Sequence, residues 1–313
     1  MRMPLARTPF AVAGRTVFVT GAARGIGAAV ARRLHAAGAN VALVGLEPEL
    51  LEQLATELGD RATWFEADVT DLRTLERAVA GTVDRFGAID VAIANAGISF
   101  IGTLATAPVA QVERALEVNL MGVWRTNRAV IEQIVAQRGY LLNIASLSAI
   151  SHTPLMGAYT ASKAGVEALT DCLRAETAAT GARVGCAYFG FIDTDLVRAS
   201  FAHPSTRGLT GSMPAFVARA APLSDAVDAI ECGIRRRSAR LWAPRWVGGA
   251  LVLRGVLQPL VDARARHSPS LPKALRRADP AHSTVADQDA TLGVAASAAR
   301  QASEPEPRSE EGS

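Results

Sequence analysis

The sequence contains few cysteines, few aromatic residues and no long uninterrupted apolar run. Its three cysteines, Cys172, Cys186 and Cys232, lack the spacing of metal ligands, so we expect them to be buried as small apolar side chains. Aromatic residues make up 5% of the chain, and no stretch combines them with basic residues as an RNA-binding surface does. No segment reaches the roughly 20 apolar residues of a membrane-spanning helix. These absences argue against a disulfide-stapled scaffold, a metal-binding module and a membrane span.

Charge and the N-terminal segment indicate where the protein works. Residues 1–13 form an arm with scattered arginine and proline and no apolar stretch of the signal-peptide kind. Cysteine usage gives no sign of an oxidising compartment, so we expect a cytoplasmic protein. The net charge is +3 and the isoelectric point is near 9.0. Arginines gather only between residues 235 and 277, where a solvated basic face accounts for them, and we expect no nucleic-acid partner.

The remaining sequence alternates short apolar runs with helical patterns. The runs that predict strands are Val17–Val19, Val41–Leu46, Thr63–Phe65, Val91–Ala94, Leu141–Ile144, Val184–Phe189 and Arg240–Trp242. The predicted helices are Ile26–Ala37, Glu49–Leu58, Leu72–Phe86, Val109–Gln137, Ala158–Thr180 and Ser224–Arg237. This rhythm predicts an α/β fold in a single domain, a Rossmann-like doubly wound parallel sheet of about seven strands with helices on both faces.

The predicted domain covers residues 14–244 and includes a substrate loop at about 197–223. Residues 245–265 carry apolar side chains at helical spacing, from Trp246 to Leu260, beside Arg245 and Arg254. Core packing, a subunit contact, a lid over an apolar substrate and peripheral membrane contact all remain open for this segment. Residues 266–313 turn rich in Ala, Ser, Pro, Arg and Glu, and we expect a disordered tail.

A glycine turn follows the first predicted strand. Gly21, Gly25 and Gly27 lie between that strand and the first helix. In this order of elements, glycines allow a tight turn, close approach of backbone N–H groups to a diphosphate, and helix–strand packing. A plain strand-to-helix connection is the alternative interpretation.

Tyr159 and Lys163 lie four residues apart in a predicted helix and therefore share one helix face. A cation beside a phenol favours the phenolate, which moves its pKa closer to the range useful for proton transfer. Taken alone, the pair also fits a surface tyrosine that packs on a lysine side chain.

With these motifs in order, the chain resembles the short-chain dehydrogenase/reductase (SDR) family. The resemblance runs from about Gly14 to about Pro244 and rests on Thr20 to Gly27, Asn95 to Gly97, Asn119, Ser146, and Tyr159 with Lys163. It implies an NAD(P)-dependent oxidoreductase that interconverts a secondary alcohol and its ketone or aldehyde by hydride transfer. It also implies a homodimer or homotetramer.

The resemblance assigns roles to individual residues. Tyr159 would be the general acid/base, Lys163 would lower its pKa and bind the nicotinamide ribose, Ser146 would hold the substrate oxygen, and Asn119 would hold a relay water. Ser148 is the rival of Ser146. The cofactor-binding residues that it implies are Gly21, Arg24, Gly25, Ile26, Gly27, Asp68, Val69, Asn95, Ala96, Gly97, Tyr159, Lys163, Gly190, Ile192 and Thr194.

The choice between the two nicotinamide cofactors depends on the end of the second strand. An acid there would bind the ribose 2′-hydroxyl and a base would accept a 2′-phosphate, yet Gly45 and Leu46 are neither. Arg24 in the glycine turn favours NADP(H), whereas Glu47 would favour NAD(H) if it reached the ribose. Phe189 stands before Gly190 where many family members have proline, which makes the nicotinamide pocket more apolar.

Apolar side chains predominate in the segments that we expect to bind the substrate. These segments contain Phe100, Met156, Phe191, Phe201, Met213 and Phe216. They predict a hydrophobic alcohol or carbonyl substrate. The expected substrate residues are Ser148, His152, Met156 and Phe191, and we expect no metal ligand. Two other functions stay open: a noncatalytic NAD(P)-sensing binding protein and a membrane-peripheral scaffold.

Overall fold

A computed structural model describes residues 9–206, 213–268 and 270–279. Its seven strands form one parallel sheet, as the sequence predicted, and their order in the sheet is β3-β2-β1-β4-β5-β6-β7. The strands are β1 (Thr16–Thr20), β2 (Asn40–Gly45), β3 (Ala62–Glu66), β4 (Val91–Ala94), β5 (Tyr140–Ile144), β6 (Arg183–Phe189) and β7 (Arg240–Ala243). The chain reverses its winding direction between β1 and β4, which is where open α/β sheets bind ligands.

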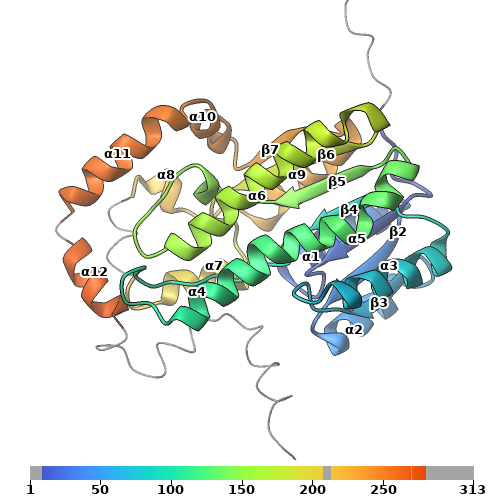
Figure 1. The fold of residues 1–313 in the computed structure, drawn as a ribbon, viewed down its shortest axis with the longest axis horizontal. Coiled ribbons are helices and arrows are strands. Elements are labelled where there is room, and N and C mark those ends of the chain that lie inside the picture. The colour runs from blue at the N-terminus through green and yellow to red at the C-terminus, as the bar shows by residue number, and fades with distance from the viewer. Residues whose placement is uncertain (1–8, 207–212, 269, 280–313) are drawn as a thin grey trace, which may run out of the picture.

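Helices cover both faces of the sheet (Figure 1). One face packs against α1 (Gly25–Ala36), α2 (Pro48–Leu58) and α9 (Leu223–Arg236). The other packs against α3 (Leu72–Phe86), α5 (Gly122–Ala136) and α6 (Gly157–Glu176). All residues of β1, β4 and β5 are buried, as expected of strands in a sheet that is covered on both sides. The prediction of a doubly wound domain is confirmed.

The long helix predicted over residues 109–137 is interrupted. It consists of α4 (Val109–Leu116), a π-helical turn η1 (Glu117–Met121) and α5. Single π-helical turns inside helices are frequent at functional sites. Here the turn contains Asn119, which is fully buried. Short 3₁₀ turns, η2 (Leu147–Ala149) and η3 (Ala178–Thr180), precede and follow α6.

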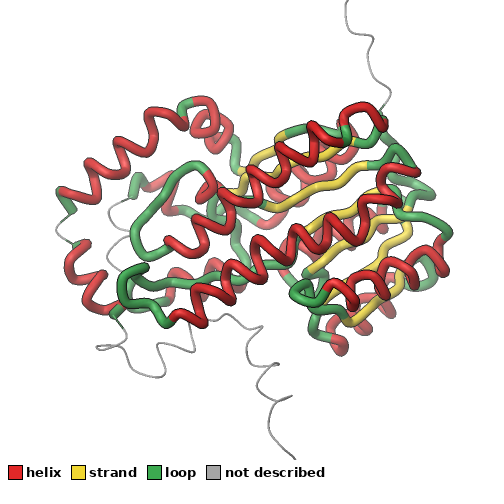
Figure 2. The backbone as a smooth tube through the Cα atoms, viewed as in Figure 1, coloured by secondary structure: helices red, strands yellow, loops and turns green. Residues whose placement is uncertain are grey.

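The C-terminal half of the chain adds helices at one end of the molecule. They are α7 (Asp195–Ala202), α8 (Ala215–Ala218), α10 (Trp246–Val252), α11 (Arg254–Arg266) and α12 (Leu271–Ala278). In Figure 1, α10, α11 and α12 form an arc at the end of the molecule away from α2 and α3, and Figure 2 shows the loops that this arc encloses.

Two further expectations from the sequence are wrong. Residues 271–278 form α12 instead of a disordered tail, because Ala274 is buried in a cluster with Ile101 and Leu155. Cys172 and Cys232 are exposed, since they lie on the outer sides of α6 and α9, and only Cys186 is buried. Most of the predicted arm (1–8), the middle of the predicted substrate loop (207–212) and the rest of the predicted tail (280–313) lie outside the described residues. Within the described ranges, no helix has the length and apolar character to cross a bilayer.

Candidate active site

The glycine turn after β1 forms a cradle that side chains would fill. Gly21 and Gly25 have φ angles of +63° and +57°, which L-residues with side chains rarely adopt. A Cβ on Gly27 would lie 2.1 Å from the carbonyl oxygen of Gly21. The Asn95 side chain donates to the carbonyls of Thr20 and Gly21, both at 3.1 Å, and so fixes the turn to the end of β4. No described side chain caps the start of α1, whose N–H groups fit a diphosphate.

A cavity of about 490 Å³ runs from this cradle to Tyr159 and Lys163. All cofactor residues that the resemblance implied line this cavity except Gly27, which packs directly under the turn. The glycine cradle and this lining fit an NAD(P) dinucleotide. Arg114, which sequence reasoning missed, also lines the cavity, and its Nη2 lies 3.8 Å from Oδ2 of Asp68. Arg114 comes from α4, far along the chain from Asp68, and no motif marks it.

Arg24 and Glu47 form an ion pair at the rim of the same cavity. The Nε of Arg24 lies 3.2 Å from Oε2 of Glu47, and a second contact joins Nη2 to Oε1. The two side chains are 35% and 17% exposed, so the carboxylate is largely held inside the rim. The positive charge that favoured a 2′-phosphate is therefore already neutralised.

Tyr159 lies in the first turn of α6, and Lys163 follows one turn later. Lys163 is 4% exposed. Its Nζ lies 5.7 Å from the centre of the Tyr159 ring and donates to the carbonyl of Ile144 at 2.8 Å. The Ser146 Oγ is held at the end of β5 by Phe189, whose carbonyl it contacts at 3.4 Å, and by the backbone N–H of Ser148 at 3.1 Å. Strand β5 and helix α6 thus bring three of the four predicted catalytic residues together.

Burial determines how these groups titrate. It raises the pKa of Tyr159, and a hydrogen bond with Ser146 offsets part of the rise. Burial also lowers the pKa of Lys163 to about 8. The expected lowering of the Tyr159 pKa by Lys163 stays a prediction, because desolvation of the phenol is the largest effect on this pKa in the structure. The phenol is protonated at neutral pH.

Asn119 acts on the backbone of a neighbouring segment. Its Oδ1 accepts from the N–H of Ile98 at 2.7 Å, and its Nδ2 donates to the carbonyl of Ile98 at 2.9 Å and to the Oγ of Ser162 at 3.3 Å. The π-helical turn places this amide between the end of β4 and the start of α6. The second lone pair of Oδ1 can still accept one further hydrogen bond.

A second, apolar cavity of about 810 Å³ adjoins the first. The residues that line both cavities are Ser146, Tyr159, Phe189, Gly190, Leu196 and Val197. Among the predicted substrate residues, Ser148, Met156 and Phe191 line the second cavity.

The placement of His152 and Phe100 differs from expectation. His152 is exposed, does not line the cavity, and has its backbone N–H bound to the side chain of Gln258. Phe100 is buried in a separate cluster with Ala115 and Ala158. The sequence showed that the two residues lie near the site but not that they point away from it. Among the described residues, no three His, Cys, Asp or Glu side chains lie close enough to share a metal ion.

The fold and the two cavities define the class of protein. A glycine cradle at the β1/β4 crossover, a Tyr-x-x-x-Lys pair and an adjoining apolar cavity describe a dinucleotide-dependent oxidoreductase with the Rossmann topology. A family model described as short chain dehydrogenase matches residues 15–205. The chain belongs to this family, and it is an oxidoreductase that acts on a CH–OH group with NAD(P).

Relatives of known name support this assignment. The chain is 36% identical over 201 residues to 2-(R)-hydroxypropyl-CoM dehydrogenase of Xanthobacter autotrophicus, which covers 62% of this chain and 80% of the relative. It is 37% identical over 186 residues to nodulation protein G of a Rhizobium species, with 59% and 76% covered. A solved structure of 3-ketoacyl-(acyl-carrier-protein) reductase from Brucella melitensis, complexed with NADH, aligns with a TM-score of 0.67 at 26% identity, covering 74% of this chain and 97% of that one.

Proposed function

We propose that this protein interconverts a secondary alcohol that has a large apolar body with the corresponding ketone. The observation that carries the proposal is the meeting of the two cavities at Ser146 and Tyr159. One cavity fits a dinucleotide, and the other offers an apolar chamber whose inner end is formed by a phenol and a hydroxyl. Hydrophobic chambers with few polar groups select apolar ligands and use those groups to fix orientation.

The residues where the two cavities meet would each have a separate role in the reaction. Bound nicotinamide would supply or accept the hydride. Tyr159, protonated at neutral pH, would donate its proton to the carbonyl oxygen in reduction. In oxidation it would first lose that proton to solvent, and the phenolate would then take the hydroxyl proton of the alcohol. Ser146 would hold that oxygen, with Ser148 supporting the serine through its backbone N–H. Lys163 would bind the ribose, and Asn119 would hold the Ile98 backbone and accept a hydrogen bond from a relay water.

For the cofactor we propose NAD(H). The preference for NADP(H) from sequence relied on Arg24, and the ion pair with Glu47 removes that support. A 2′-phosphate at this rim would be repelled by the carboxylate, whereas a 2′-hydroxyl can donate to it. The NADH complex of the similar reductase agrees with this choice. A homodimer or homotetramer in the cytoplasm is the family-based expectation for the assembly.

The alternative functions receive less support. A cofactor sensor without catalysis has no need for a second cavity that reaches Tyr159 and Ser146. A membrane-peripheral scaffold function would account for neither cavity. We therefore propose neither of these two functions for the protein.

The test combines cofactor binding with one substitution. Fluorescence titration should show tighter binding of NADH than of NADPH. Oxidation of hydrophobic secondary alcohols with NAD⁺ should be measurable, and Tyr159→Phe should lower kcat by at least about 100-fold. Tyr140→Phe is the matched control, since the Tyr140 hydroxyl bonds to the carbonyl of Ser238 and lines neither cavity. Turnover by Tyr159→Phe at the rate of the control would refute the assignment.

A further inference from the structure

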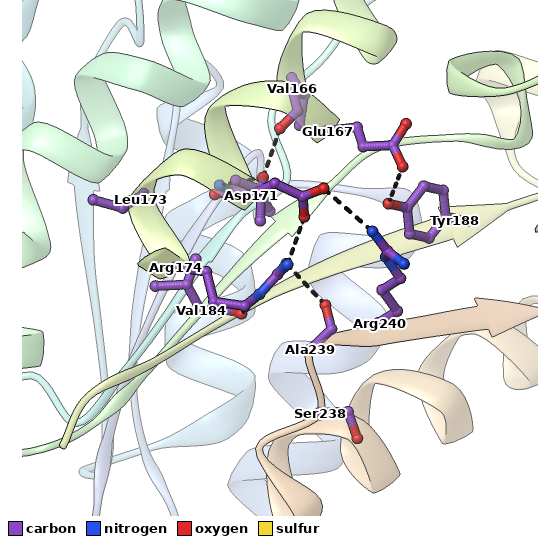
Figure 3. Close-up of polar contacts among 12 residues, drawn as sticks. Val166, Glu167, Asp171, Leu173, Arg174, Val184, Tyr188, Ser238, Ala239 and Arg240 are labelled. Atoms are coloured by element: carbon purple, nitrogen blue, oxygen red, sulfur yellow. Dashed lines mark hydrogen bonds and ion pairs between the residues drawn. The ribbon is translucent and has the colours of Figure 1, made fainter. Parts of the chain in front are cut away.

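The C-terminal helix α11 is fastened to α6 and to the loop before α6. Arg254 of α11 pairs with Glu167 of α6 at 2.7 Å, and the Glu167 side chain is only 8% exposed. The hydroxyl of Tyr188 donates to the same carboxylate at 2.8 Å, as Figure 3 shows. The Gln258 amide bonds both the N–H and the carbonyl of His152, at 2.8 and 3.2 Å. These contacts give α11 a defined orientation, so the same side of the helix stays turned toward solvent.

The solvent side of α11 carries an apolar stripe. Leu253, Val256 and Leu260 are 62%, 59% and 62% exposed, and Val252 at the end of α10 is 83% exposed. The first three recur every three or four residues, which places them along one side of the helix over a length of about 10 Å. Single exposed apolar side chains are common, but a row of them marks an interaction surface.

The apolar cavity opens at this stripe. Leu253 and Leu260 belong to the stripe and also line the cavity. Phe216 of α8 lines the cavity as well and is 59% exposed. Side chains that line a cavity while more than half of their surface meets solvent lie at its mouth. The exposed stripe and the cavity interior therefore form one continuous apolar surface.

Positive charge is concentrated in the arc of α10, α11 and α12 that carries the stripe (Figure 1). Residues 245–278 contain seven arginine or lysine residues and a single aspartate, a net charge of +6, whereas the whole chain carries +3. Arg245, Arg266, Lys273 and Arg276 are exposed, and none of the four forms an ion pair with another described residue. We call the apolar stripe together with these four cations the C-terminal face.

We propose that the C-terminal face binds the surface of a bilayer that contains anionic phospholipid. The stripe would enter the boundary between head groups and acyl chains, and the cations would lie among the phosphates. A second copy of the chain fits this face less well, because a two-fold contact would bring the same positive charge against itself. On the bilayer, an apolar ligand would pass between the lipid and the cavity without entering water. The inference concerns binding and does not depend on the proposed reaction.

Flotation of the full-length protein with two kinds of vesicle provides the test. One kind is phosphatidylcholine alone, and the other contains about one third phosphatidylglycerol. Each cation near an anionic surface strengthens partitioning about fivefold, so we expect the protein to bind the anionic vesicles at least about 100-fold more tightly. Added salt should weaken this binding, because the charges are exposed. Equal binding to both kinds of vesicle, or binding to neither, would overturn the proposal.

Paired variants test the two charges on α12. Lys273→Gln combined with Arg276→Gln should weaken binding to the anionic vesicles about 25-fold. Arg73→Gln combined with Arg77→Gln is the matched control, since these arginines are exposed on α3 at the other end of the molecule. The control should bind as wild type does. An equal loss in both double variants would mean that net charge alone matters, and would overturn the assignment to the C-terminal face.

A single substitution tests the stripe. Val256→Gln should weaken binding to the anionic vesicles about tenfold, because a valine that enters the bilayer loses its apolar contact. Val256 lines neither cavity, so NADH binding should not change. Leu50→Gln, at an exposed leucine of α2, is the control and should bind vesicles as wild type does. Sedimentation velocity adds the last outcome: a dimer that Val256→Gln dissociates, without vesicle binding, would assign the face to a second copy and overturn the proposal.

Discussion

Replacing Lys163 with methionine should make the protein more stable and inactive at the same time. Burial moves the lysine pKa from 10.5 to about 8. At about 1.4 kcal/mol per pH unit, keeping this ammonium charged in the fold at neutral pH costs about 3 kcal/mol. Methionine avoids that cost but gives up the hydrogen bond to Ile144, worth about 1 kcal/mol. We expect Lys163→Met to raise the free energy of unfolding by about 2 kcal/mol at pH 7.

The pH dependence distinguishes this effect from simple repacking. Because the pKa in the folded state lies below the unfolded value, the unfolded chain binds the extra proton between about pH 8 and pH 10.5. Wild-type stability therefore gains from this group as the pH rises through that window, and below pH 8 the full cost applies. The variant lacks the group, so its advantage should disappear near pH 10.5.

Urea unfolding at pH 7 and pH 10 measures both values. Lys273→Met is the matched control, since Lys273 is the other lysine of the chain and is exposed on α12. It should change the free energy of unfolding at neither pH. Lys163→Met should also lose NADH-dependent turnover, because the proposed ribose contact is gone. A variant less stable than wild type at pH 7, or an advantage that is equal at both pH values, would refute the reasoning.

Two further substitutions test the cofactor cavity. Glu47→Gln should improve the Kd for NADPH relative to NADH by about tenfold, because the carboxylate no longer neutralises its arginine partner. Glu57→Gln is the control, because it breaks a half-exposed surface pair with Arg32. It should leave the ratio of the Kd values for NADPH and NADH unchanged. The same change of this ratio in both variants would contradict the role of the Arg24–Glu47 pair. Gly27→Ala should destabilise the fold by about 1–3 kcal/mol and weaken NADH binding, since its Cβ would lie 2.1 Å from a backbone oxygen of the glycine turn. Gly255→Ala in α11 should change neither the stability nor NADH binding, because no described atom lies within 4 Å of the added carbon. Unchanged NADH binding by Gly27→Ala would contradict the reasoning and show that the glycine turn can shift to accept the Cβ.

The strands and the glycine turn were readable from sequence because each depends on local chemistry. An apolar run such as Val17 to Val19 must be buried wherever it folds, and glycines between a strand and a helix permit only a few backbone paths. Tyr159 and Lys163 could be paired for the same reason, since helical spacing puts them on one face. The sequence could not show that Lys163 bonds to Ile144, because that partner comes from a strand 19 positions away.

Other features of the site depend on contacts between distant segments. The ion pair of Arg24 with Glu47 joins the turn after β1 to the segment after β2, and it changes which cofactor the rim favours. His152 carries a suitable side chain, but Gln258 of α11 holds its backbone at the surface. Helical patterning marked residues 109–137 as one helix, yet a π-helical turn at Asn119 interrupts it.

The sequence by itself determined the doubly wound sheet, the dinucleotide cradle and the Tyr159–Lys163 pair, because hydrophobic periodicity, glycine backbone freedom and helical spacing are all short-range properties. Only the tertiary structure decided that burial raises the pKa of Tyr159, that Glu47 pairs with Arg24, and that α11 lines an apolar cavity next to the site. Each of these depends on desolvation or charge pairing between segments far apart in the chain, and such effects exist only once the fold has brought those segments together.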